Sequence, residues 1–128
     1  MIRINVSKIS NCPVSSVSLK RRLKIFLEAE GIVSTAELSI ALIGEKEMIE
    51  IGKKYLGEGS IHNVLSFVPD EVKDKFVYPN DGIIHLGEIM VCYPLAYKQA
   101  KKENKLIEDV VYELVEHGAR HLLGQHHN

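Results

Sequence analysis

The apolar residues of this chain recur at two different spacings, which predicts a mixture of strands and helices. In segment 2–6 every second residue is apolar, as in a half-buried strand. Leu19, Leu23 and Phe26 instead follow the three-to-four-residue spacing that places side chains on one face of a helix. By the same reasoning we expect strands at 2–6, 37–43, 63–68 and 83–92, and helices at 14–30, 45–56, 94–102 and 106–123.

The expected helices and strands are interleaved, but the connections between strands differ in length. A helix follows strand 37–43, whereas a long loop separates strand 63–68 from strand 83–92. This mixture favours an α+β fold with a mixed sheet over a doubly wound parallel sheet. Gly31 is expected to end the first helix, and Gly87, inside the last strand, predicts a bulge or a close approach of another segment.

The composition indicates one globular domain, which we take to be the whole chain, residues 1–128. The sequence is 45% hydrophobic and 26% charged, and its length is sufficient to bury a hydrophobic core. A net charge of -1 predicts no overall attraction to nucleic acid, so RNA binding would require local basic residues. Without a signal peptide or an apolar span, we expect a cytoplasmic protein with no membrane partner. Cys12 and Cys92 are then expected to be reduced thiols.

Four of the six histidines lie in the last twelve residues, HGARHLLGQHHN, and their spacing is that of metal ligands. His117 and His121 are four residues apart on the predicted helix, so both imidazoles can reach one ion. Gly124 is placed to end this helix in a left-handed conformation, after which the chain can turn back and deliver His127. We therefore predict one zinc ion per chain bound by His117, His121 and His127, with Ni²⁺ or Cu²⁺ also compatible.

The histidine pattern carries further information about the chemistry. Three neutral histidines leave one zinc position open, which is typical of a catalytic site. The spacing matches the long zinc-protease signature, but Gly118 stands where a protease has its glutamate base, so a peptidase is disfavoured. The competing interpretations are a surface histidine pair and a purification tag. A third histidine at the right distance argues against the pair, and the lack of a contiguous run argues against the tag.

Three blocks of the sequence resemble the YbeY family of bacterial rRNA maturation endoribonucleases. HGARHLLGQHH is similar to the family block H-G-x-L-H-L-x-G-x-D-H, YLGEGSIHNVLSF to Y-R-G-x-x-x-P-T-[ND]-V-L-S-F, and HLGEIMVC to L-G-D-I-x-[IV]-C. The resemblance spans residues 37–127 and implies a zincin-like fold with a metal-binding C-terminal helix. It also implies cleavage of single-stranded RNA in 16S rRNA 3′-end maturation and ribosome quality control, with ribosomal components as partners and the oligomeric state left open.

Several residues depart from the family pattern. Leu56 replaces an arginine to which phosphate binding is ascribed, and His126 replaces an aspartate that could orient a histidine ligand. Arg120 stands where an apolar residue is expected, and Glu88 replaces an aspartate. The chain stops one residue after His127, so we expect that ligand to depend on the metal for its order.

These departures leave two functions open. The three-histidine spacing favours a metal-dependent endoribonuclease, whereas Leu56 and His126 favour a ribosome- or RNA-binding factor that keeps the metal for stability and has lost catalysis. Further residues are candidates for lining an RNA-binding cleft, but each can also be a solvent-exposed or capping residue without a function. We favour this simpler interpretation for His62, Glu113 and two clusters of lysines and arginines. These candidates are Asn63, Ser66, His62, Glu113, the cluster Lys20, Arg21, Arg22 and Lys24, and the cluster Lys98, Lys101, Lys102 and Lys105.

Arg120 and His126 are the candidate catalytic residues beyond the ligands. One hypothesis is that Arg120, beside the metal-binding face, replaces the guanidinium lost at Leu56, although an exposed helix residue is the simpler interpretation. The hypothesis predicts that Arg120→Ala abolishes RNA cleavage while metal content stays intact. Normal cleavage by this variant would rule it out.

Overall fold

Four strands form one mixed sheet in the order β1-β2-β4-β3, with β1, β2 and β4 parallel and β3 antiparallel to β4. The computed structural model describes residues 1–69 and 82–126. In chain order the elements are β1 (Ile2–Lys8), α1 (Ser16–Ala29), β2 (Ala36–Ile43), α2 (Glu45–Leu56), β3 (Val64–Phe67), β4 (Ile84–Cys92), α3 (Tyr93–Glu103) and α4 (Ile107–His126). The expected α+β fold with a mixed sheet is confirmed.

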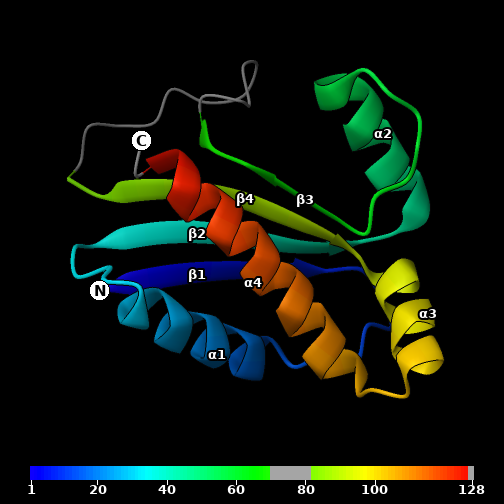
Figure 1. Cartoon of the computed structure of the whole chain (residues 1–128), viewed down its shortest axis with the longest axis horizontal. Coiled ribbons are helices and arrows are strands. Elements are labelled where there is room, and N and C mark those ends of the chain that lie inside the picture. The colour runs from blue at the N-terminus through cyan, green and yellow to red at the C-terminus, as the bar shows by residue number, and fades with distance from the viewer. Residues whose placement is uncertain (70–81, 127–128) are drawn as a thin grey trace.

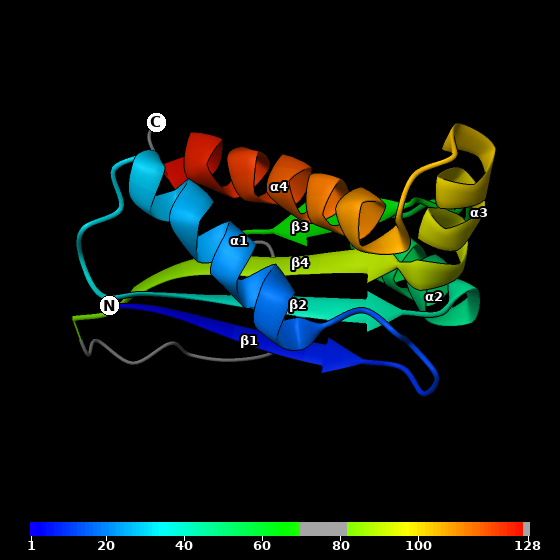
Figure 2. The same ribbon diagram turned by 90° about the horizontal axis from the view of Figure 1, so that it is seen from below.

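Helices α1 and α4 lie against one face of the sheet and cover the main hydrophobic core (Figures 1 and 2). Leu38, Ile40 and Leu42 alternate along β2 and are all buried in this core, as are Leu23 of α1 and Val115 of α4. Burying a side chain of this size contributes roughly 1.5–3 kcal/mol, so this layer supplies most of the driving force for folding. None of the helices in the described part of the chain has the length and apolar character needed to span a bilayer.

A second, smaller apolar cluster lies where β2 and β4 end. Ile43 and Cys92, the last residues of these strands, pack with Met48 of α2, and all three are buried. This contact attaches α2 to the end of the sheet and thereby positions the loop that runs from α2 into β3. Both cysteines are free and buried, and burial raises the pKa of the Cys92 thiol.

Gly87 forms the bulge that the sequence predicts in β4. Glu37 of β2 pairs with His85, whereas the next residue, Leu38, pairs with Gly87, so β4 contains one extra residue at this point. Gly87 has a φ of 138°, and a β-carbon there would collide with the carbonyl oxygen of Phe67 on β3. Only glycine therefore satisfies both the backbone conformation and the close approach of β3.

The two ends of α1 also follow the sequence signals. The Ser15 side chain accepts a hydrogen bond from the backbone N–H of Ser18, at 3.1 Å, and so caps the first turn. At the other end Gly31 has a φ of 95°, and its N–H donates to the carbonyl oxygen of Glu28. The predicted glycine stop is therefore confirmed for this helix.

The same signal fails at the end of α4, and the prediction that Gly124 ends this helix is wrong. The helix continues through Gly124 to His126, and Gly124 is not among the described glycines with positive φ. A glycine inside a helix costs only about 1 kcal/mol relative to alanine, so it permits a helix end without enforcing one. The turn that was expected to deliver His127 therefore does not occur at Gly124.

We expect Gly124→Ala to raise the free energy of unfolding by up to about 1 kcal/mol, because alanine is the better helix former. A β-carbon at this position meets no atom within 4 Å. Urea denaturation of the metal-free protein measures the change. Gly31→Ala is the matched control and should be destabilising, because its φ of 95° strains any L-residue. Destabilisation by Gly124→Ala would indicate a left-handed residue and contradict the continuous helix.

Candidate functional site

A cleft of about 280 Å³ lies between α4, β3 and the C-terminal end of α2. Its position follows from the fold, because β3 is the edge strand beyond β4 and α4 packs over both strands (Figure 1). The lining is mostly apolar, with two imidazoles and one hydroxyl as its polar groups. The lining residues are Leu56, Val64, Leu65, Ser66, Phe67, His117, Gly118 and His121.

The two predicted ligands on α4 lie together in this cleft. His117 and His121 are both exposed, and both line its wall, as their four-residue spacing predicts. Among the described residues no group of three histidine, cysteine or acidic side chains is placed to hold an ion. His127 and the side chain of His126 lie outside the described part of the chain. The three-histidine metal site therefore stays a prediction.

Gly118, which follows His117 in sequence, lies at a close contact between α4 and the sheet. A β-carbon at this position would lie 2.9 Å from Cγ2 and 3.3 Å from Cγ1 of Ile89 on β4. The side chain of a glutamate does not fit there without moving the helix away from the sheet. Close packing against Ile89 thus explains why this position holds glycine and not the glutamate of the zinc-protease signature.

The wall formed by β3 carries one polar side chain. Ser66 lines the cleft, as proposed from the sequence, and faces the same way as Val64 because side chains alternate along a strand. Asn63 is exposed and is not among the lining residues, and its carbonyl oxygen accepts a hydrogen bond from the Cys92 N–H at 2.9 Å. Leu56 is 46% exposed at the cleft edge, so this position presents an apolar group to a ligand.

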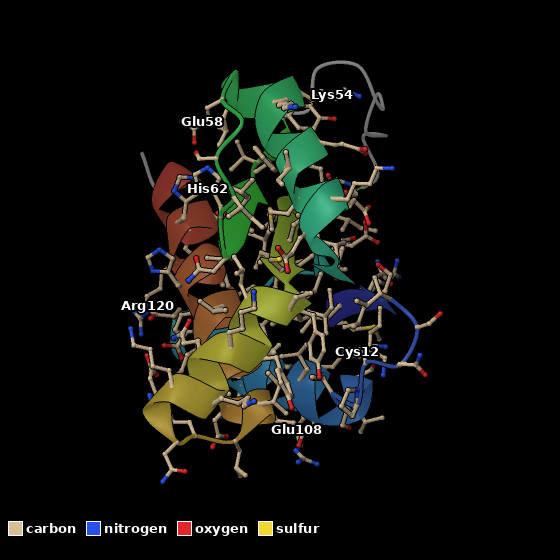
Figure 3. All side chains as sticks on the ribbon, turned by 90° about the vertical axis from the view of Figure 1, so that its right-hand side faces the viewer. Cys12, Lys54, Glu58, His62, Glu108 and Arg120 are labelled. Atoms are coloured by element: carbon tan, nitrogen blue, oxygen red, sulfur yellow. The ribbon has the colours of Figure 1, made fainter. Side chains whose placement is uncertain are left out.

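Arg120 does not lie in the cleft. Its guanidinium is 3.3 Å from an oxygen of Glu30, the residue that follows α1, and 3.6 Å from a Glu116 oxygen one turn earlier on α4. It also stacks 4.8 Å from the centre of the Phe26 ring. Figure 3 shows Arg120 on the outer side of α4. This position does not support the hypothesis that Arg120 replaces the family arginine lost at Leu56. A catalytic role of Arg120 stays a prediction that the geometry does not favour.

Arg120 belongs instead to a line of polar contacts that joins α4 to α1. The Arg22 guanidinium is 3.0 Å from an Asp109 oxygen and stacks 4.2 Å from the centre of the Tyr112 ring. The Tyr112 hydroxyl donates a 2.9 Å hydrogen bond to Glu116. Burial, together with this bond to a carboxylate, raises the pKa of Tyr112 to about 12, so the hydroxyl remains a donor. These contacts fix the rotation of α4 that turns His117 toward the cleft.

The basic clusters also engage in contacts within the fold. Arg22 forms an ion pair with Asp109. Lys105 forms an ion pair with Glu113 at 3.2 Å, so the Glu113 carboxylate has a partner other than His117. None of the basic residues is among the residues that line the described cleft. The structure therefore places neither cluster in the cleft, Arg22 is half-buried in its contact with Asp109 rather than solvent-exposed, and a role of the clusters in RNA binding stays untested.

Sequence reasoning missed one contact near the cleft. His62 is half-buried, and its Nε2 lies 2.5 Å from Oε1 of Glu58 in the loop between α2 and β3. The sequence does not single out Glu58, and it predicts an exposed loop residue at His62. The only signal in the sequence is an acid four residues before a histidine, and in a loop this spacing does not imply contact.

Comparisons with known proteins agree on one family. The family model described as "Endoribonuclease YbeY" matches residues 6–128. A protein of that name from Dehalococcoides mccartyi is 34% identical over 122 residues, covering 90% of this chain and 71% of its own. The namesake from Macrococcus caseolyticus is 35% identical over 107 residues, covering 83% and 69%. The Thermobifida fusca protein is 30% identical over 124 residues, covering 97% and 80%.

One solved structure supports the fold independently of these names. The solution structure of a Thermotoga maritima protein is similar with a TM-score of 0.57 and 25% sequence identity. The match covers 95% of this chain and 71% of the Thermotoga maritima chain. The arrangement of the sheet and helices is thus shared over almost the whole described chain.

The placement of Arg120 changes the expected outcome of its substitution. We expect Arg120→Ala to lower the free energy of unfolding by about 1 kcal/mol, through loss of an exposed ion pair and a cation–π contact, and to leave cleavage of RNA largely intact. Thermal denaturation and a cleavage assay on the same preparation measure both effects. Lys46→Ala, an exposed cation on α2, is the control. Loss of cleavage at unchanged stability would instead support the catalytic hypothesis.

Proposed function

The chain belongs to the family of the endoribonuclease YbeY, and we propose that it is a metal-dependent endoribonuclease that cleaves single-stranded RNA in the cleft between α4 and β3. The observation that carries this proposal is the position of His117 and His121. Both line one open cleft in a chain whose family match extends over residues 6–128. A mostly apolar cleft with a few convergent polar groups is the usual setting of an active site.

The metal site of this proposal is built on α4. His117 and His121 fit zinc, because exposed imidazoles one helical turn apart are common zinc ligands and both face the same cleft. The third ligand in this proposal is His127, which lies outside the described residues. When bound by these residues, a zinc ion would supply a positive charge able to polarise a phosphoryl oxygen. Imidazole ligands are also compatible with Ni²⁺ or Cu²⁺.

The remaining cleft residues supply binding. The Ser66 hydroxyl can donate a hydrogen bond to a phosphate oxygen, and Leu56, Val64 and Leu65 offer an apolar surface to a base or ribose. An open, unpaired strand suits this surface better than a duplex, because its bases are free to contact an apolar wall. Leu56 offers no charge to the RNA, so binding through this wall is expected to be only weakly dependent on salt.

The physiological substrate in this proposal is ribosomal RNA. The sequence blocks that resemble the family support a role in maturation of the 16S rRNA 3′ end and in ribosome quality control, with ribosomal components as partners. A second candidate function is an RNA- or ribosome-binding factor without catalysis. It is favoured by one observation, namely that Leu56 leaves the described cleft wall without a cationic side chain.

The test is cleavage of a single-stranded fragment of 16S rRNA by zinc-loaded protein. We expect cleavage by the unaltered protein and a loss of at least about 100-fold in the His117→Ala, His121→Ala double variant, because both metal ligands are removed. A double variant of two exposed α2 residues, Glu47→Ala and Glu50→Ala, is the control and should retain activity.

Metal analysis of the same preparations separates the two candidate functions. Zinc bound by the unaltered protein, with RNA binding but no cleavage, would favour the binding factor. Equal cleavage by the unaltered protein and the double histidine variant would contradict an enzymatic role of the cleft.

A further inference from the structure

The described cleft lacks a side chain suited to accept the proton of an attacking water molecule. No carboxylate is among its lining residues, and the packing of Gly118 on Ile89 leaves no space for one between the two histidines. If His117 and His121 are used as metal ligands, their lone pairs cannot serve as proton acceptors. General-base catalysis contributes about 10²–10⁴-fold to a rate, so a proton acceptor near the cleft would add substantially to cleavage.

The loop between α2 and β3 borders this cleft at both of its ends. Leu56, the last residue of α2, and Val64, the first residue of β3, both line the cleft, and the loop that joins them carries Glu58 and His62. Figure 3 shows the Glu58 and His62 side chains close together, on the side of the loop on which α4 lies. His62 is 31% exposed, so its ring is held by the fold and remains accessible.

The contact with Glu58 determines which ring nitrogen of His62 carries the proton. Glu58 Oε1 lies 2.5 Å from His62 Nε2, and an ionised carboxylate can only accept a hydrogen bond. In the neutral form of the ring this contact places the proton on Nε2 and leaves Nδ1 as the proton acceptor. A carboxylate that fixes the tautomer and orientation of a histidine is a recurrent arrangement in general-base catalysis.

Further contacts hold this pair in place. The Ser60 hydroxyl donates a 3.2 Å hydrogen bond to the same Glu58 oxygen, which restricts the carboxylate. The loop also packs on α2 at Gly52, where a β-carbon would lie 3.4 Å from the Glu58 carbonyl oxygen and 3.9 Å from Cδ2 of His62. The part of the loop that carries Glu58 and His62 therefore lies against α2 at Gly52.

We propose that His62 is the general base of the RNA-cleaving cleft and that Glu58 is its positioning residue. In this step the oxygen of a water molecule attacks the phosphorus of a phosphodiester, and its proton moves to Nδ1 of His62. The bond from phosphorus to one ribose oxygen breaks, and that oxygen takes a proton from solvent water. His62 then returns its proton to solvent. The inference rests on the proposed ribonuclease function and adds an assigned base to it.

The test compares cleavage of single-stranded rRNA by variants of the zinc-loaded protein. We expect His62→Ala to lower kcat by about 100-fold or more while KM and zinc content change less than about twofold, because the base acts on the chemical step. Added imidazole should restore part of the activity of His62→Ala. Glu58→Gln should lower kcat less, and Glu50→Gln, on an exposed residue of α2, is the matched control.

A second measurement reports on Glu58 without using activity. Nitrogen-15 NMR of the unaltered protein should show His62 protonated at Nε2, and Glu58→Gln should shift the ring toward a mixture of tautomers. If the unaltered protein cleaves RNA and His62→Ala has the same kcat, the assignment of His62 as the base is overturned while the proposed ribonuclease function stands. Protonation of His62 at Nδ1 would also overturn it. Absence of cleavage by the unaltered protein would overturn the proposed function, and this inference with it.

Discussion

The close packing of α4 on β4 is the constraint on which the site depends. At Gly118 the helix approaches Ile89 so closely that a β-carbon would lie 2.9 Å from that side chain. This contact brings His117 and His121 over the edge of the sheet, where β3 provides the facing wall of the cleft. It also explains why the residue after the first histidine is not a catalytic acid, because the space that a glutamate requires is filled by the sheet.

Different faces of helix α4 line the cleft and contact α1. One face carries His117 and His121 to the cleft, whereas another is held on α1 through Arg22, Tyr112 and Arg120. Exposed ion pairs of this kind contribute little to stability individually, but together with the buried core they define the rotation of the helix. The cleft histidines are thus oriented by residues that lie outside the lining of the cleft.

Periodicity and turn signals predicted every described element because strands and helices bury one face at a regular spacing. Gly87 was also predictable, since glycine within a strand signals a bulge or a close approach. The course of α4 past Gly124, the turning of Arg120 toward α1, and the contact of Glu58 with His62 were not predictable. Each depends on a tertiary neighbour that sequence spacing does not specify, and the position of His127 stays a prediction.

We propose that His117 and His121 hold a metal ion in the cleft between α4 and β3. The most direct measurement is anomalous diffraction at the zinc edge from crystals of the zinc-loaded protein. We expect one strong peak per chain at a bonding distance of about 2.1 Å from a ring nitrogen of each histidine. A peak bound by other residues, or a folded protein that takes up no zinc, would contradict it.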